Sequence, residues 1–288
     1  MATLPASTSV NTRVMDCGGW PLDLGRVAVM GILNLTPDSF SDGGLFMSRD
    51  QAVSHALKMA DEGADIIDVG GESTRPGTLA VSVQEELDRV VPVIEALRRE
   101  VEIPISIDTS KAQVMREAAS AGAGMINDVK ALREENALAM AAELGVPVCL
   151  MHMQGEPRSM QVNPTYKDVV VEVRDFLSAR RQACLDVGIH EKKILIDPGF
   201  GFGKTLEHNL ELLRNLSELK SVGAPVLVGL SRKSMIGKAI GLPVDKRLHA
   251  SVALAILAVR NGADVIRLHD VAATREAVRM VEAVYRAA

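Results

Sequence analysis

Eight short apolar runs recur along the 288-residue chain, and long segments of helical character separate them. Each run is apolar through its centre and does not alternate with polar residues, as expected of strands buried on both faces of a parallel sheet. Eight strand-helix units in a chain of this length predict an α/β fold, a (β/α)8 TIM barrel. The alternative is a doubly wound open sheet, which the helix after the last strand and the lack of a dinucleotide glycine motif disfavour. The runs span residues 26–34, 64–71, 104–110, 124–129, 147–153, 193–199, 225–231 and 263–270.

The helical segments often end in glycine and alanine just before the next strand, at 63–64, 122–123 and 262–263. Glycine supplies the left-handed cap of a helix, so this recurrence is a weak internal repeat of one strand-helix unit. No stretch resembles a linker, and we therefore expect a single domain with the barrel over residues 26–288. Residues 1–25 form an N-terminal segment, in which 12–25 resemble a short hairpin suited to plug the barrel floor.

Composition excludes several classes of protein. Hydrophobic residues make up 47% and charged residues 24% of the chain, which is ordinary for a globular protein. The net charge of −5 argues against nucleic-acid binding, and no unbroken apolar stretch is long enough for a membrane span. The first ten residues lack a signal-peptide pattern, and three scattered cysteines suit no disulfide framework. We expect a cytoplasmic protein with small-molecule partners, no nucleic acid and no membrane.

The stretch DPGFGFGKT at 197–205 resembles a phosphate-binding loop, but its spacing is wrong. A P-loop needs glycine at the position of Pro198, and proline has no N–H to offer a phosphate. Gly199, Gly201 and Gly203 run at spacing two, which also excludes the dinucleotide fingerprint. The more informative residue is Asp197, a carboxylate at the end of an apolar strand.

Polar side chains stand at the ends of all eight runs, where a barrel of this kind has its active site. Buried polar groups are costly unless they are paired, so eight such strand ends indicate a functional site. The strand-end residues are Asn34, Asp68, Asp108, Asn127, His152, Asp197, Lys233 and Arg267, and loop residues such as Glu72, Arg75 and His269 follow them.

Some of these residues have simpler interpretations. Asp128 and Thr109 are as well explained as caps of the following helices. His152, between two methionines, fits a packed side chain better than a catalytic one. Arg232 also fits a surface charge, and Glu85, Glu86 and Asp88 are expected on a solvated helix face.

The remaining residues suggest a chemistry. Asp108, Asn127 and Asp197 offer carboxylate and amide groups that suit a flat heterocycle with N–H donors. Positive groups on the same face suit a phosphate or a pyrophosphate, namely Arg75, Lys233, Arg267 and His269.

Zinc is disfavoured, because the chain has no C-x-x-C, no H-E-x-x-H and no paired histidines. A hard ion such as Mg²⁺, shared between Asn34 and a pyrophosphate, fits better. No nucleophile has an adjacent base, so the pattern indicates departure of a pyrophosphate aided by charge neutralisation and positioning.

Together these segments resemble the dihydropteroate synthase family of folate biosynthesis from about residue 26 to the C-terminus. The matching motifs occur in order, each at a strand end. They are MGILNLTPDSFSDGG (30–44), DVGGESTRPG (68–77), SIDTSK (106–111), IND (126–128), LMHMQG (150–155), DPGFGFGK (197–204), GLSRKSMIG (229–237) and RLHD (267–270).

The resemblance implies a Mg²⁺-dependent homodimeric transferase, the target of sulfonamides, that joins 6-hydroxymethyl-7,8-dihydropterin diphosphate to 4-aminobenzoate. The implied mechanism is dissociative: the C–O bond breaks first, and the amine attacks a pterin-methyl cation. It implies that Asp108, Asn127, Asp197 and Lys233 hold the pterin, that Asp108, Asp197, Lys233 and Arg267 are catalytic, and that Asn34 binds Mg²⁺. It also implies that Asn34, Thr74, Arg75, Arg267 and His269 hold the diphosphate, and that Thr36, Pro37, Ser73, Pro76, Phe202 and Ser231 shape the 4-aminobenzoate site.

On this interpretation the glycines of 197–204 let the backbone turn closely around a flat substrate, with Phe202 as a wall. Two alternatives share the fold. A pterin-binding methyltransferase would have no use for TPDSFSDGG or SRKS, and a catalytically silent pterin-binding barrel would not need the diphosphate residues. The helical segment 247–263 is apolar enough to be a dimer interface, although its apolar stripe also suits packing against the barrel.

Overall fold

The computed structural model describes residues 13–36, 48–73, 80–155, 160 and 163–286. Within these residues eight parallel strands form one sheet in the order β8-β7-β6-β5-β4-β3-β10-β9. The two edges of the sheet meet, because Ile196 of β8 forms a parallel bridge with Val226, just before β9. The sheet is therefore a closed barrel, which confirms the predicted fold class. Its strands are β3 (Ala28–Asn34), β4 (Ile66–Gly70), β5 (Ile105–Asp108), β6 (Met125–Asp128), β7 (Val148–Met151), β8 (Ile194–Asp197), β9 (Leu227–Gly229) and β10 (Val265–Leu268).

Each predicted run contains one strand, but the strands are shorter than the runs. The run at 225–231, for example, contributes only the three residues of β9. The polar residues after each strand leave the hydrogen-bonded ladder and begin the loops. This shortening leaves most of the predicted site residues among the last two residues of a strand or beyond its end.

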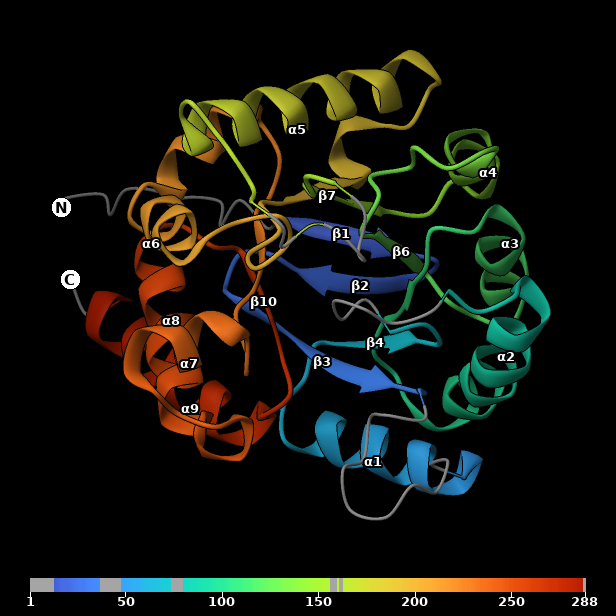
Figure 1. Ribbon diagram of the computed structural model, residues 1–288. Coiled ribbons are helices and arrows are strands. Elements are labelled where there is room, and N and C mark those ends of the chain that lie inside the picture. The colour runs from blue at the N-terminus through green and yellow to red at the C-terminus, as the bar shows by residue number, and fades with distance from the viewer. Residues whose placement is uncertain (1–12, 37–47, 74–79, 156–159, 161–162, 287–288) are drawn as a thin grey trace, which may run out of the picture.

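Helices follow the strands in chain order and surround the barrel as a ring (Figure 1). Side chains cap several helix starts: Ser48, Ser82, Asp168 and Thr205 each accept a backbone N–H from the first turn. Helices within the described residues are α1 (Arg49–Asp61), α2 (Val83–Glu100), α3 (Ala112–Ser120), α4 (Ala137–Leu144), α5 (Val169–Asp186), α6 (Leu206–Arg214), α7 (Ser234–Ile240), α8 (Leu248–Arg260) and α9 (Val271–Arg286), with 3-10 turns η2 (Glu191–Lys193), η3 (Leu216–Val222) and η4 (Val244–Lys246).

The predicted glycine caps are present. Gly63, Gly122 and Gly262 follow α1, α3 and α8 and have φ of +94°, +113° and +104°. Residues with a side chain rarely adopt this backbone region. None of the described helices is both long enough and apolar enough to cross a lipid bilayer.

A hairpin of β1 (Val14–Cys17) and β2 (Trp20–Asp23) closes the floor of the barrel, as predicted. Its buried side chains Met15 and Leu22 pack against residues from the barrel interior. Burial of side chains of this size contributes about 1.5–3 kcal/mol each, which attaches the hairpin firmly to the barrel. The interior partners are Ala28, Met30, Ile66, Met125, Cys149, Leu195, Leu227 and Val265.

Candidate active site

The polar side chains predicted for the site lie at the carboxyl ends of the barrel strands. Asn34, Asp108 and Asp197 end β3, β5 and β8, and Asn127 is the last residue but one of β6. The strand register places Asn34 beside Gly70, Gly70 beside Asp108 and Asp108 beside Asn127. A Cβ atom on Gly70 would lie 3.6 Å from Asn34 Oδ1 and 3.5 Å from the Asp108 Cβ. The missing side chain at Gly70 therefore leaves Asn34 and Asp108 as neighbours across an open position.

A guanidinium group links the polar residues of β4, β5 and β6. Arg267 of β10 donates from Nε to Asp68 Oδ2 at 2.6 Å and from Nη2 to Asp108 Oδ2 at 2.7 Å. Asn127 donates from Nδ2 to the same Asp68 oxygen at 3.1 Å. Asp68 is fully buried, so its charge needs these partners. The geometry makes Asp68 the centre of a network that orients both Arg267 and Asn127.

The network shifts the ionisation of its members. Burial raises the pKa of Asp108 to about 7, against the lowering effect of the Arg267 charge and with a further increase from Asp68. Burial alone would lower the pKa of Arg267, but Asp68 and Asp108 outweigh it and raise that pKa. Asp108 is therefore a carboxyl group that changes charge near neutral pH, beside a permanent cation.

Asp197 and Lys233 form a second part of the site. Burial raises the pKa of Asp197, and the charge of Lys233 opposes this shift. Burial lowers the pKa of Lys233 to about 8, against Asp197 and together with the repulsion of Arg267. Lys233 donates to the carbonyl of Phe200, and its Nζ lies 4.6 Å from the centre of the Phe202 ring. The Phe202 ring therefore packs beside Lys233, one of the predicted pterin residues.

The glycines of residues 199–203 have a different explanation from the predicted one. Gly199 and Gly203 have φ of +66° and +61°. A Cβ atom at these positions would overlap the carbonyl oxygens of His152 and Gln154, which follow β7. Glycine is required here because two backbone segments pack tightly together. Protein packing, rather than close approach to a substrate, accounts for these two glycines.

Ser231 and His269 lie together at the rim. Their Oγ and Nδ1 atoms are 3.0 Å apart, and the His269 backbone N–H donates to Ser231 Oγ at 3.3 Å. The neighbouring Arg232 is exposed and forms a bidentate ion pair with Asp270, which confirms the surface interpretation. The residues predicted for the amine and for the diphosphate are therefore adjacent at this point.

The predicted site extends beyond the described residues. Pro37, Thr74, Arg75 and Pro76 lie outside them. Thr36 and Ser73 are described, and both are partly buried.

One prediction about α2 was wrong. Glu86 does not lie on a solvated face; it is fully buried and forms an ion pair with Lys111, which also contacts Glu72. The reason is helical spacing, because Glu86 shares a face with Val90 and Leu97, which are also buried. Glu85 and Asp88 are exposed, as predicted.

The interpretation of Asp128 as a cap of the following helix is wrong, whereas that of His152 as a packed side chain is confirmed. Asp128 accepts the backbone N–H groups of Lys130 and Leu132, both at 2.8 Å, and so stabilises the turn after β6, several residues before α4 begins. His152 is 5% exposed and packs edge-on against Phe176, with ring centres 4.9 Å apart.

Asp68 was predicted at a strand end, but no specific role was predicted for it or for Lys204. Asp68 is a charged residue inside the apolar run 64–71, and such a residue needs a buried partner; that signal was available. Lys204 is 1% exposed, and its ammonium end lies within the glycine loop. The position of a lysine after a glycine-rich stretch gives no comparable signal.

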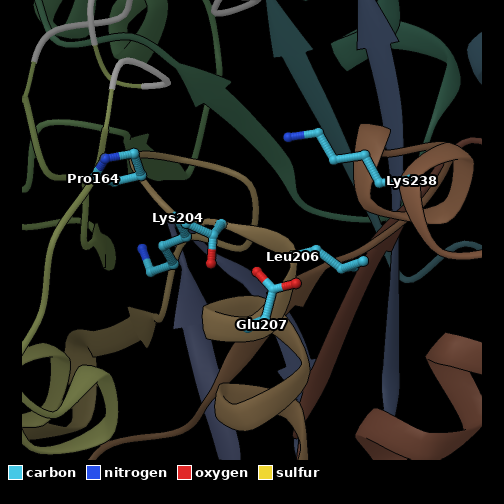
Figure 2. A pocket seen from close by; sticks show the side chains of 6 residues that line it. Pro164, Lys204, Leu206, Glu207 and Lys238 are labelled. Atoms are coloured by element: carbon cyan, nitrogen blue, oxygen red, sulfur yellow. The ribbon is translucent and has the colours of Figure 1, made fainter.

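A pocket of about 320 Å³ lies beside this loop, lined by Pro164, Lys204, Thr205, Leu206, Glu207 and Lys238. Figure 2 shows that the Lys204 side chain runs away from Leu206 and Lys238. The pocket does not include the Arg267 network, and among the described residues that line it Glu207 is the carboxylate. We therefore place the site at the strand ends and not in this pocket.

Comparison with known proteins shows the family of this chain. The family model described as pterin binding enzyme matches residues 30–269, which include every described strand-end residue named above. The dihydropteroate synthase of Haemophilus influenzae is 55% identical over 262 residues, 91% of this chain and 95% of that relative.

Two solved structures are similar over nearly the whole chain. The dihydropteroate synthase of Yersinia pestis, solved with a sulfonamide drug complex, has a TM-score of 0.92 and 52% identity, covering 96% of this chain and 100% of its own. The Xanthomonas albilineans enzyme in complex with 7,8-dihydropteroate has a TM-score of 0.87 and 50% identity, covering 94% and 98%.

Proposed function

This chain belongs to the dihydropteroate synthase family of pterin-binding enzymes, and from that premise we propose which residues carry out each part of its reaction. The reaction joins 6-hydroxymethyl-7,8-dihydropterin diphosphate to 4-aminobenzoate and yields 7,8-dihydropteroate and pyrophosphate. The observation that carries the assignment is the Arg267 network beside Asp197 and Lys233. In this arrangement the hydrogen-bond acceptors that suit a heterocycle lie next to the cations that suit a diphosphate.

The pterin site consists of Asp108, Asn127, Asp197 and Lys233. Asn127 donates its amide nitrogen to Asp68, which directs the amide oxygen toward the remaining side as an acceptor for a ring N–H. The carboxylates of Asp108 and Asp197 accept further N–H groups of the pterin. The same charges stabilise the pterin-methyl cation that forms when the C–O bond breaks.

The diphosphate site combines Arg267, His269 and Asn34 with the predicted Thr74 and Arg75. Among the contacts of the described residues, Arg267 uses Nε and Nη2 for Asp68 and Asp108. We assign its Nη1 to the diphosphate. Charge neutralisation by Arg267 makes the diphosphate a better leaving group, because the negative charge grows as the C–O bond breaks.

A divalent metal, Mg²⁺ on the sequence prediction, fits this site through an oxygen ligand. Among the described residues no cluster of three or more histidine, cysteine or acidic side chains can hold a metal ion. Mg²⁺ commonly takes one or two protein oxygens and completes its shell with substrate phosphates and water. Asn34 Oδ1, open toward the missing side chain of Gly70, supplies such an oxygen. When bound, the ion would neutralise part of the diphosphate charge.

The amine site lies at the rim, formed by Phe202, Ser231, Thr36 and Ser73 with the predicted Pro37 and Pro76. The ring of Phe202 packs against Lys233, so it lies beside the pterin residues. The nitrogen of 4-aminobenzoate is neutral at pH 7 and attacks the cation directly. It then loses a proton to solvent, and no strong base is needed.

A homodimer is the proposed assembly. Apolar side chains stand exposed on neighbouring helices: Leu248 and Leu257 of α8 are 37% and 50% exposed, and Met280 of α9 is 64% exposed. These helices lie side by side (Figure 1). Exposed apolar side chains that gather in one patch mark a protein interface, and Leu257 and Met280 are the candidates for such a patch. Sedimentation of the chain and of Leu257→Glu tests this: a dimer that Leu257→Glu dissociates supports it, and a wild-type monomer refutes it.

Two further proposals follow the sequence. Residues 26–288 form the pterin-binding barrel, with residues 1–25 as an N-terminal segment. The location is the cytoplasm, which the three free cysteines Cys17, Cys149 and Cys184 suit.

The function is tested by incubating the purified protein with both substrates and Mg²⁺ and detecting 7,8-dihydropteroate by mass spectrometry. We expect product that requires both substrates. Pterin binding without product would instead indicate a silent pterin-binding barrel or a pterin-binding methyltransferase.

A further inference from the structure

Among the described residues, the hydrogen-bond partners of the buried Lys204 are backbone carbonyls and a histidine ring, and none is a carboxylate. Lys204 Nζ lies 2.9 Å from the Gly199 carbonyl, 3.0 Å from the Phe202 carbonyl and 2.9 Å from His152 Nδ1. Lysine is almost never fully buried unless it is paired. Here the Lys204 side-chain nitrogen is the hydrogen-bond donor to two backbone carbonyls of the loop, those of Gly199 and Phe202. The arrangement ties both ends of residues 199–202 to one point.

These contacts persist in either charge state of the lysine. Burial lowers the pKa of Lys204, and the charge of Asp197 opposes the shift. An ammonium donates to all three partners. A neutral amine donates to the two carbonyls and accepts from the Nδ1–H form of His152. The loop is therefore held at any pH near neutrality.

His152 fixes the third contact. Burial and the Lys204 charge lower the pKa of His152 to about 2, so its ring is neutral. The ring packs against Phe176, and its backbone N–H donates to the Asp197 carbonyl at 2.9 Å. His152 thus joins the end of β7 to the end of β8 on one side and to Lys204 on the other.

The outer side of the same loop carries the pterin residues. The Gly199 N–H donates to Asp197 Oδ1 at 2.7 Å, and the Phe200 carbonyl accepts from Lys233. The Phe202 ring faces Lys233 Nζ at 4.6 Å. These contacts with Asp197 and Lys233 therefore involve the same backbone segment that Lys204 holds.

We propose that Lys204 is a positioning residue for the pterin reaction: it holds residues 199–202 in the conformation that aligns Asp197, Lys233 and Phe202, with His152 as its third partner. The inference rests on the proposed pterin site. Lys204 touches no substrate in this role; it acts through the loop.

The test compares Lys204→Met with Lys193→Met. The two lysines flank β8 at its opposite ends, and Lys193 also donates to a backbone carbonyl, that of Gly145, on the far side of the barrel. Misplacement of active-site groups by about 1 Å costs about 100-fold in rate. We expect Lys204→Met to raise KM for the pterin diphosphate and to lower kcat/KM by about 100-fold. We expect Lys193→Met to stay within about twofold of wild type.

A purely structural role gives a different result. Lys204→Met would then lower the melting temperature, while the folded fraction would keep the wild-type KM, and this outcome overturns the proposal. If the wild type itself forms no dihydropteroate, the proposed function fails instead, so the two failures are distinguishable.

A second pair keeps the test decisive if Lys204→Met does not fold. His152→Asn places an oxygen near the position of Nδ1, whereas His152→Leu has nearly the same shape and no acceptor. We expect His152→Asn to keep a KM for the pterin diphosphate several-fold closer to wild type than His152→Leu does. Equal KM values in the two folded variants overturn the proposal.

Discussion

Neutralising Asp68 should move the pH dependence of pterin turnover to lower pH. Asp68 is fully buried and shares the Arg267 guanidinium with Asp108, through contacts of 2.6 and 2.7 Å. Asp68→Asn keeps the shape and one acceptor oxygen but removes a negative charge. The remaining Arg267 charge then acts mainly on Asp108. Both changes favour the ionised form of Asp108 and lower its pKa.

The size of the effect follows from the shared guanidinium. Two carboxylates on neighbouring nitrogens of one guanidinium have charge centres about 5 Å apart, and at an effective dielectric constant of about 20 they repel by about 3 kcal/mol. That energy corresponds to about two pKa units. The pKa of Asp108, about 7 in the wild type, should fall to roughly 5. Below its pKa Asp108 is protonated and loses its role as an acceptor, so kcat/KM declines on the acid side.

The raised pKa of Asp108 also makes the stability of the fold depend on pH. The folded pKa of Asp108 lies above its unfolded value, so the folded state binds more protons between about pH 4 and 7. The stability from this group is fully present below about pH 4 and is lost as pH rises toward 7. Asp68→Asn should flatten this slope.

The assay is kcat/KM for the pterin diphosphate between pH 5 and 9, with Asp65→Asn as the control. Asp65 precedes β4 at the other end of the barrel, where it pairs with Arg26 and Arg275. Its loss should destabilise the fold without moving the profile. An acid limb that stays near pH 7 in Asp68→Asn, or that moves equally in Asp65→Asn, would refute the coupling between Asp68 and Asp108.

Four further substitutions have defined outcomes. Lys233→Arg should remove an alkaline limb of kcat/KM near pH 8, because the wild-type ammonium is lost above its pKa; a limb retained in the variant assigns it to another group. Asp197→Asn or Lys233→Ala should abolish pterin binding in calorimetry while circular dichroism shows the fold intact, and retained binding removes that residue from the pterin site. Arg267→Ala should weaken diphosphate binding at least tenfold, about 1.4 kcal/mol, and unchanged affinity for pyrophosphate contradicts the diphosphate assignment. The same change should lower the stability of the fold by about 3–5 kcal/mol, because the Asp68 and Asp108 carboxylates lose their cation.

The barrel was predictable because strands buried on both faces carry continuous apolar runs. The strand ends were also predictable in kind: Asp108, Asn127 and Asp197 do meet at one face, because parallel strands place their carboxyl ends together. Which strands are adjacent in a barrel follows from strand order alone. The position of these residues required no knowledge of side-chain contacts.

The side-chain contacts of the site were harder to predict from the sequence. That Arg267 spends two nitrogens on Asp68 and Asp108 depends on a contact across about 200 residues of sequence, and no local pattern encodes it. Glu86 was predicted on the solvated face of its helix because it is charged, although its position along the helix puts it on the buried face. The glycines of 199–203 were predictable as a tight turn, but their neighbour, the backbone at His152 and Gln154, comes from another strand-helix unit.

The most direct test of the whole account is pyrophosphate release from the pterin diphosphate with Mg²⁺, measured with and without 4-aminobenzoate. The account predicts release coupled to dihydropteroate when the amine is present, and slow release without it, because the C–O bond breaks before the amine attacks. Release that depends strictly on the amine would contradict the dissociative order. Pterin binding with no release under either condition would contradict the assignment of the strand-end site to this reaction.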